Sequence, residues 1–461
     1  MNLLNYLDSL LAGFTDVRVV RNAKNLVGKI IENKTIKLWT ISEDKAEYER
    51  YVNLLDGTLK SILDDEKIAD ALREKSVAAF DEHKRLYLLH DPCDIRKKHA
   101  RKLENLGKVR DLDGKIINGY SSFGSAIVDE AGKRIYPADI TIYSNRDNHY
   151  VKAAELEAYE KGKLQQSEDE EERRRAVQIE QYIEEESYLN LSSVTQTQLR
   201  RVSQALKVQN PQVHLCHVLD RQFDDEKGVF VFIDQELEDE FVIRLKLSRN
   251  SNQYAYNEKK EKDVAVKLKT VDFADKHRFV IPKFRRKGKV YQNVTCQAET
   301  DTLTLTDKQY TVVRVTLFDR HGKPIYKNPM LLISNIVLKS AKEGVDIYRI
   351  YLLRAKIEQV FKFFKGALGW EECQLRNYEA IKNLLALCFF IGGYFYEIES
   401  ELINNRNVAL IAQLGGGKRK VTRHYFLEGL KKMLILADVT RFRENNEVDD
   451  ETWQEMLEFV S

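Results

Sequence analysis

Apolar and polar positions repeat with two different periods along this chain, and the changes of period divide it into segments. Residues 1–80 carry apolar positions at helical spacing, for example at Leu26, Val27, Ile30 and Ile31. From residue 84, short apolar runs bounded by turns predict strands instead. These runs are 84–91, 121–129, 133–143, 213–220 and 240–246, and the first three predict an antiparallel meander. A helix is predicted over 195–207, and the charged segment 150–187 predicts a solvated helix.

Residues 249–345 have a different sequence pattern, with short alternating runs rich in Val, Thr, Tyr and Lys. They predict a separate β-rich unit, after which the pattern is helical to the end. The predicted domains are therefore a helical N-terminal domain (1–80), the first part of an α/β core (81–248), a β-rich insertion (249–345), a core helix (346–370) and a helical C-terminal domain (371–461).

Composition sets broad limits on the kind of protein. A chain of 461 residues with 43% hydrophobic content can bury large cores. Its five cysteines include no C-x-x-C pair, so neither a zinc site nor a disulfide framework is indicated, which suits a reducing cytoplasm. The N-terminus has no basic region before its apolar residues. The apolar run 384–396 is too short to span a bilayer and predicts a buried core helix. We therefore expect a cytoplasmic protein with no membrane partner.

The net charge of +2 hides two strongly basic segments. Residues 18–37 hold six Lys or Arg against one acid, as expected of a DNA-reading helix or of a solvated bundle helix, and we predict that the helical domain 1–80 binds DNA. Residues 241–300 hold fifteen Lys or Arg against six acids, with a peak at 283–289 and aromatic residues such as Phe284 and Tyr291 between them. Such a mixture suits a groove that neutralises phosphates and stacks bases, although lysines also protect exposed sheet edges.

The most informative pattern is a polar stripe in residues 351–365. On one continuous helix, Tyr351, Arg354, Lys362 and Lys365 would all lie within roughly 40° of Glu358. Ile350, Leu353, Ile357, Phe361 and Phe364 would occupy a neighbouring apolar arc that packs on a core. A carboxylate among cations can hold a divalent metal beside a polyanion, but such a stripe is also typical of a solvated helix face.

Two further acids, Asp91 and Asp220, each end a predicted apolar strand. If these strands are neighbours and the helix with Glu358 packs over them, three carboxylates converge. Such a cluster repels itself unless it holds Mg²⁺ or Mn²⁺. Two such ions about 4 Å apart can activate an attacking oxygen and stabilise the leaving oxygen of a phosphoryl transfer. These acids therefore point to the cutting or joining of DNA.

The stripe resembles the Y-x-x-R-x-x-x-E-x-x-x-x-x-x-K signature of bacterial DDE transposases of the cut-and-paste insertion-sequence type (insertion-sequence family four), with Tyr351, Arg354, Glu358 and Lys365 at its four positions. Two other motifs look similar. Asp91-Pro-Cys-Asp94 resembles the first aspartate motif, with Cys93 where many members carry Thr. Asp220-Arg-Gln-Phe-Asp224 followed by Phe241-Val-Ile-Arg244 resembles the second.

The resemblance implies an RNase H-like fold, with the β-rich block inserted between its fifth strand and the Glu358 helix. It implies that Asp91, Asp220 and Glu358 bind two Mg²⁺ or Mn²⁺ ions. Tyr351, Arg354 and Lys365 would hold the DNA end, with Lys362 as a helper. The reaction would be nicking at inverted-repeat ends, hairpin formation on flanking DNA and strand transfer into double-stranded target DNA. Members act as homodimers, for which residues 371–461 are the expected pairing region, and would be associated with the nucleoid.

One departure concerns the hairpin step. Related enzymes place a tryptophan in the inserted block to support a flipped base, whereas this chain has only Trp39, Trp370 and Trp453. Either another aromatic residue, such as Phe284 or Tyr291, takes that role, or the hairpin step differs. Two rival hypotheses stay open: a catalytically silent or domesticated relative that binds element ends, and a nuclease of the same fold that acts on branched DNA.

Overall fold

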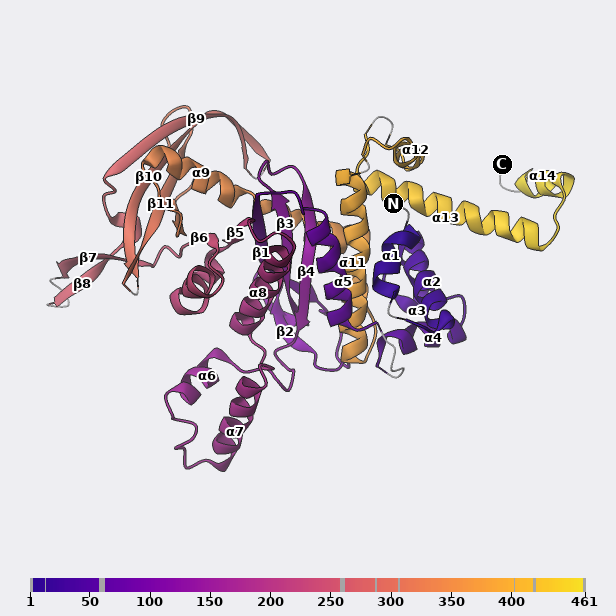
Figure 1. Ribbon diagram of the computed structural model, residues 1–461, viewed down its shortest axis with the longest axis horizontal. Coiled ribbons are helices and arrows are strands. Elements are labelled where there is room, and N and C mark those ends of the chain that lie inside the picture. The colour runs from indigo at the N-terminus through magenta and orange to yellow at the C-terminus, as the bar shows by residue number, and fades with distance from the viewer. Residues whose placement is uncertain are drawn as a thin grey trace.

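The computed structural model describes residues 3–12, 14–57, 63–257, 262–286, 288–305, 307–401, 403–417 and 420–458. One large sheet runs through the molecule, and helices cover it and extend from it (Figure 1). The strands of this ten-stranded sheet are β1 (Arg85–Arg96), β2 (Gly107–Arg110), β3 (Ile116–Asp129), β4 (Ile135–Tyr143), β5 (His214–Leu219), β6 (Glu240–Arg244), β9 (Asp275–Arg286), β10 (Lys289–Leu305), β11 (Lys308–Phe318) and β12 (Met330–Ser334).

The core of the sheet has the order β4-β3-β1-β5-β6. β3 is antiparallel to β1 and to β4, whereas β1, β5 and β6 are parallel. Residues 86–90 of β1 and 215–219 of β5 are all buried, as expected of central strands in a sheet that carries helices on both faces. This order is that of an RNase H-like core, and the mixed α/β class predicted from the sequence is confirmed.

Adjacent residues of β3 show which helix covers each face. Gly124 lies against Phe361 of α10 (Ala355–Ala367), and a Cβ at Gly124 would stand 2.6 Å from that ring. Ser125 accepts a hydrogen bond from Gln198 of α8 (Leu191–Gln209) at 2.7 Å. Successive side chains of a strand point to opposite faces, so α10 and α8 cover opposite faces of the sheet. Glycine at 124 thereby lets α10 approach β3 closely.

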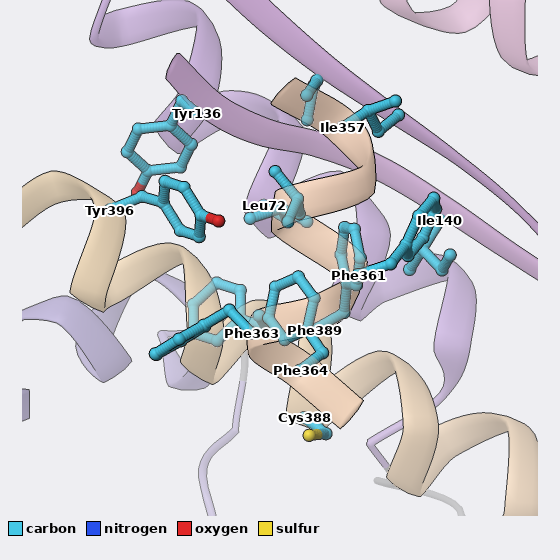
Figure 2. Packing of buried hydrophobic residues seen from close by; sticks show 14 of the residues in the cluster. Leu72, Tyr136, Ile140, Ile357, Phe361, Phe363, Phe364, Cys388, Phe389 and Tyr396 are labelled. Atoms are coloured by element: carbon cyan, nitrogen blue, oxygen red, sulfur yellow. The ribbon is translucent and has the colours of Figure 1, made fainter. Parts of the chain in front are cut away.

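α10 is anchored by aromatic packing against the apolar helix α11 (Tyr378–Glu401), as Figure 2 shows. The rings of Phe364 and Phe389 lie 4.4 Å apart, and Phe361 stacks on Trp370 with centroids 6.1 Å apart. Aromatic pairs of this kind add about 0.5–1.5 kcal/mol each beyond the area they bury. By length and composition alone, Tyr378–Ser400 could cross a membrane, but 94% of its most apolar window is buried within the fold. The prediction of a buried core helix over 384–396 is thus confirmed.

The predicted β-rich insertion does form strands, but its sheet is not separate. β12 pairs with β6, so β11, β10 and β9 extend the core sheet beyond β6. The sequence pattern gave no sign of this pairing, because periodicity within a segment does not reveal a strand that returns to pair with a distant one. Only the hairpin of β7 (Asn250–Asn257) and β8 (Lys262–Lys267) forms a second sheet among the described residues. α9 (Ala341–Leu352) contacts β9, β10 and β11.

Helices make up both terminal regions, as predicted. At the N-terminus they are α1 (Leu3–Leu11), α2 (Val17–Asn33), α3 (Leu38–Ile41), α4 (Lys45–Leu55) and α5 (Asp65–Ala78). At the C-terminus α11 is followed by α12 (Arg406–Leu414), α13 (Arg423–Asn445) and α14 (Asp450–Glu458). The charged segment 150–187 forms two mostly exposed helices, α6 (Ala153–Glu160) and α7 (Glu170–Glu184), rather than one. They form an arm that projects from the sheet (Figure 1).

The basic helix predicted at 18–37 is α2, and its apolar positions are buried. Several of its cations are already paired within the protein. Lys24 pairs with Asp8 at 3.0 Å, and Lys29 pairs with Glu43 at 2.7 Å. These pairs are what a solvated bundle helix would show, so they favour that alternative for α2 over a DNA-reading helix.

Candidate active site

The two aspartates lie side by side at one edge of the sheet. β1 and β5 pair in parallel as far as Leu89 and Val218. Asp91 and Asp220 each follow two residues later, so the register places them next to each other beyond the end of β5. Asp220 comes directly after its strand, as predicted, whereas Asp91 does not end β1. The strand continues to Arg96 because it still pairs with β3, where Asp91 faces Gly124.

The segment 351–365 was predicted as one helix, but the structure divides it. α9 ends at Leu352 and α10 begins at Ala355, with a tight turn between them. Four of the five amides from Leu353 to Ile357, all except that of Ala355, donate to the carbonyl three residues earlier at 2.9–3.1 Å. No Pro or Gly marks this turn, so the sequence gives no signal of it.

The turn brings the side chains of Tyr351 and Arg354 onto the acids. The Tyr351 hydroxyl donates a hydrogen bond to Asp220 Oδ1 at 3.0 Å. Arg354 Nη1 donates to Asp91 Oδ1 at 3.1 Å, and its Nη2 donates to Glu358 Oε1. One guanidinium therefore joins the acid on β1 to the acid on α10. The structure thus brings together Tyr351, Arg354 and all three predicted acids.

Burial and crowding of charge dominate the electrostatics at Asp91. Its side chain is 17% exposed. Burial raises the pKa of Asp91 to about 7, and the charges of Glu358 and Asp220 add to this rise while Arg354 opposes it. Burial and the charge of Asp220 also raise the pKa of Tyr351 to about 12, so its hydroxyl stays a hydrogen-bond donor.

The two lysines of the stripe lie in different environments. Lys365 Nζ donates to the Asp94 carbonyl at 2.7 Å and to Glu371 Oε1 at 2.9 Å, and its side chain is 19% exposed. Lys362 is exposed and has no hydrogen bond or ion pair with any residue that the structure describes. Lys365 therefore links α10 to β1, whereas the ammonium of Lys362 is free to meet a ligand.

The acids supply the oxygen ligands that Mg²⁺ and Mn²⁺ prefer, and the crowded negative charge at Asp91 is one that a cation would relieve. The residues therefore fit a divalent metal by their chemistry. In the present arrangement, however, Arg354 bonds two of the carboxylates, and no group of three His, Cys, Asp or Glu side chains within the described ranges is close enough to hold a metal ion.

The second aspartate motif shapes the loop after β5. Arg244 Nη1 lies 3.8 Å from Asp220 Oδ1, and the Arg221 amide donates to the same oxygen at 2.7 Å. Asp224 accepts hydrogen bonds from the Lys246 amide at 2.8 Å and from Arg249. Asp224 therefore ties this loop to the segment after β6, and Arg244 faces Asp220.

A chain of buried polar groups on the α8 face was not predicted. It links Ser125, His90, His217 and Asp239 through distances of 2.7, 3.0 and 3.0 Å. The carboxylate of Asp239 requires His217 to donate from Nε2, so His217 Nδ1 must accept from His90, and both rings are satisfied while neutral. Burial, with the neighbouring His217, lowers the pKa of His90 well below its usual value. The only sequence signal was a histidine within each apolar strand.

The aromatic residues considered for the hairpin step lie together on the insertion. Phe284 and Tyr291 are cross-strand partners on β9 and β10, with ring centroids 6.4 Å apart. Tyr326 packs edge-on against Phe284 at 6.3 Å, and Arg286 lies over the Tyr326 ring at 4.1 Å. Of the basic peak at 283–289, Lys287 lies outside the described residues. The predicted mixture of cations and aromatic rings is therefore present on one hairpin.

An RNase H-like sheet with two aspartates at one edge and a glutamate on a covering helix is the architecture of nucleases and transposases of this fold. Residues 213–391 match the family model described as the transposase DDE domain. The matched segment contains β5, Asp220, the inserted strands and α10 with Glu358, whereas Asp91 precedes it. No curated protein matches the chain. The match supports a DDE transposase, a class that acts on DNA and generally uses divalent metal ions.

Proposed function

We propose that this chain is a cut-and-paste transposase that cleaves DNA at the ends of an insertion sequence and joins the freed 3′ ends to target DNA. The proposal rests mainly on the contacts from Tyr351 and Arg354 to the three acids. These acids come from three elements that are distant in sequence. Two of them, Asp220 and Glu358, belong to the segment that matches the transposase DDE domain.

In this proposal Asp91, Asp220 and Glu358 hold two Mg²⁺ or Mn²⁺ ions. When bound, such ions supply activation of the attacking oxygen and stabilisation of the leaving oxygen. The protein's own part is to aim the carboxylates. Tyr351 fixes one oxygen of Asp220, and Arg354 holds Asp91 and Glu358 facing each other from two sides of the site. The scissile phosphate would lie against this edge of the sheet.

We infer the contacts with DNA from which cations have no partner within the described part of the protein. Lys362 presents its ammonium to solvent one turn beyond Glu358, so it would bind a backbone phosphate directly. Arg354 is bonded to two carboxylates, and a phosphate at the site would compete with them for its guanidinium. Lys365 supports the site from beneath by linking α10 to β1. Tyr351, Arg354 and Lys365 would meet the DNA end only through such exchange.

We further propose that the protein pairs with a second copy through its C-terminal helices. α13 extends away from the sheet and carries α14 at its far end (Figure 1). Ile435, Val439 and Phe442 are exposed on α13, and their spacing places them within roughly 60° of one another. Such an exposed apolar stripe is typical of a helix that pairs with another, and a homodimer would hold two DNA ends together.

The test uses purified protein, Mg²⁺ and a duplex that carries the inverted repeat flanking its gene. Asp91→Ala, Asp220→Ala and Glu358→Ala should each lower cleavage by on the order of a thousandfold while end binding persists. Asp113→Ala, which changes an exposed acid in the β2–β3 turn, is the matched control. Unchanged cleavage in any one of the three variants refutes the site. A wild-type protein that binds the end but never cuts it supports the silent relative instead.

A further inference from the structure

A cationic cavity lies on the other flank of the helix that carries Glu358. It has a volume of about 330 Å³ and lies between α10, α11, the turn before β4 and the start of α13. Its polar lining includes Lys133, Lys356, Tyr396, Glu399 and Arg423. None of these residues takes part in the catalytic contacts described above, so the cavity is a second site.

The buried hydroxyl of Tyr396 indicates that the cavity binds a ligand. The residue is only 1% exposed, and its hydroxyl has no hydrogen-bond partner among the residues that the structure describes. Figure 2 shows the ring projecting from α11 toward α10. Leaving a buried hydroxyl unpaired costs about 1–3 kcal/mol. A protein can retain such a group when a ligand oxygen accepts its hydrogen bond.

The charges around this hydroxyl select an anion. Arg423 lies over the Tyr396 ring at 4.1 Å and pairs with Glu399, which leaves the guanidinium fixed in place. Lys133 and Lys356 have no ion pair within the described part of the chain. The lining therefore carries three cations against one acid. A group with several acceptor oxygens and a negative charge would satisfy both the hydroxyl and the ammonium groups.

We propose that this cavity binds a phosphate group of the DNA backbone. That the phosphate comes from DNA rests on the proposed function, because a protein that cuts DNA meets backbone phosphates at high local density. The position of the cavity also supports DNA as the ligand, since Lys356 and Gln359 flank Glu358 in sequence and line the cavity. A strand seated there would run along α10 on the flank away from Asp91. Free phosphate offers the same chemistry, so the two sources must be separated by experiment.

The first experiment measures the anion site alone. Inorganic phosphate is titrated into the full chain and followed by ³¹P NMR and thermal unfolding. Tyr396→Phe removes only the hydroxyl and should weaken phosphate binding about tenfold without lowering the stability of the ligand-free protein. Tyr425→Phe, on a half-exposed tyrosine of the adjacent helix α13, is the matched control and should change neither value. Equal phosphate binding by wild type and Tyr396→Phe would overturn the site.

The second experiment tests the DNA backbone as the source. Duplex affinity is measured against salt concentration for Lys133→Gln/Lys356→Gln, with Lys163→Gln on the projecting arm as the control. The double variant should lower the salt slope by about two, because each neutralised phosphate contributes about 0.9. An unchanged slope, with phosphate still bound, would overturn DNA as the ligand. If the wild-type protein binds no DNA, the proposed function fails together with DNA as the ligand, while the phosphate titration still decides whether the anion site exists.

Discussion

Asp91 should make the protein less stable as the pH rises, and Asp91→Asn should remove that dependence. Burial raises the pKa of Asp91 to about 7, with Glu358 and Asp220 adding to the effect. The folded protein therefore binds this proton more tightly than the unfolded chain, whose aspartate titrates at 3.8. The contribution of the proton to stability is fully present below about pH 4 and is lost as the pH rises to about 7.

The size of this change in the free energy of unfolding follows from the shift in the pKa of Asp91. A rise from 3.8 to about 7 at about 1.36 kcal/mol per pH unit corresponds to about 4 kcal/mol. Solvent screening takes little from this value because the side chain is only 17% exposed. Asp91→Asn has no such titration. Its free energy of unfolding should therefore rise by about 4 kcal/mol relative to wild type between pH 4 and pH 8.

The assay is urea unfolding of both proteins at several pH values, without and with Mg²⁺. The exposed Asp113→Asn is the control, and its difference from wild type should not vary with pH. Mg²⁺ should stabilise wild type more at pH 8 than at pH 5, since metal binding competes with the proton on Asp91. A difference between Asp91→Asn and wild type that stays constant from pH 4 to pH 8 would refute the raised pKa of Asp91 that its burial and the neighbouring acids produce.

Three further outcomes follow from the contacts. Lys362→Gln should lower the salt slope of DNA binding by about one and leave stability unchanged. Lys365→Met should cost about 1–3 kcal/mol in urea unfolding, because it loses two partly buried hydrogen-bond partners. His217→Leu should cost about 2–4 kcal/mol by the same assay, since His90 and Asp239 both lose a partner, and His217→Asn should recover part of it. Ile435→Ser/Phe442→Ser should shift the protein toward monomer in light scattering with DNA bound; an unchanged mass places the pairing surface elsewhere.

The parts of the fold that depend on local pattern could be predicted. Apolar runs located β1, β5 and β6, and the acid after β5 is where the structure places it. The end of β1 could not be predicted in this way. Asp91 interrupts the apolar run, yet the strand continues because β3 still pairs with it on one side. Strand length is decided by the neighbouring strand, which hydrophobicity within one segment does not report.

The contacts that build the site were predictable only as a shared helix face. The stripe at 351–365 indicated which residues belong together, but the turn at Leu353 and Arg354 carries no breaker residue. The histidine chain was missed for a similar reason. His90 and His217 become neighbours only through the parallel pairing of β1 with β5, which joins residues 127 positions apart.

The spacing of Tyr351, Arg354 and Lys365 along the chain matches the distances between the parts of the sheet that they contact, as well as the period of a helix face. Tyr351 contacts the acid that follows β5, Arg354 contacts the acid on β1, and Lys365 contacts the carbonyl of Asp94 farther along β1. Neighbouring strands lie about 4.8 Å apart, close to the 5.4 Å rise of one helical turn. Each of these three residues therefore meets a different point of the sheet edge. One inserted residue would rotate the rest of the helix by about 100° and separate Glu358 from Arg354. The spacing is thus required to assemble the acids even before DNA is bound.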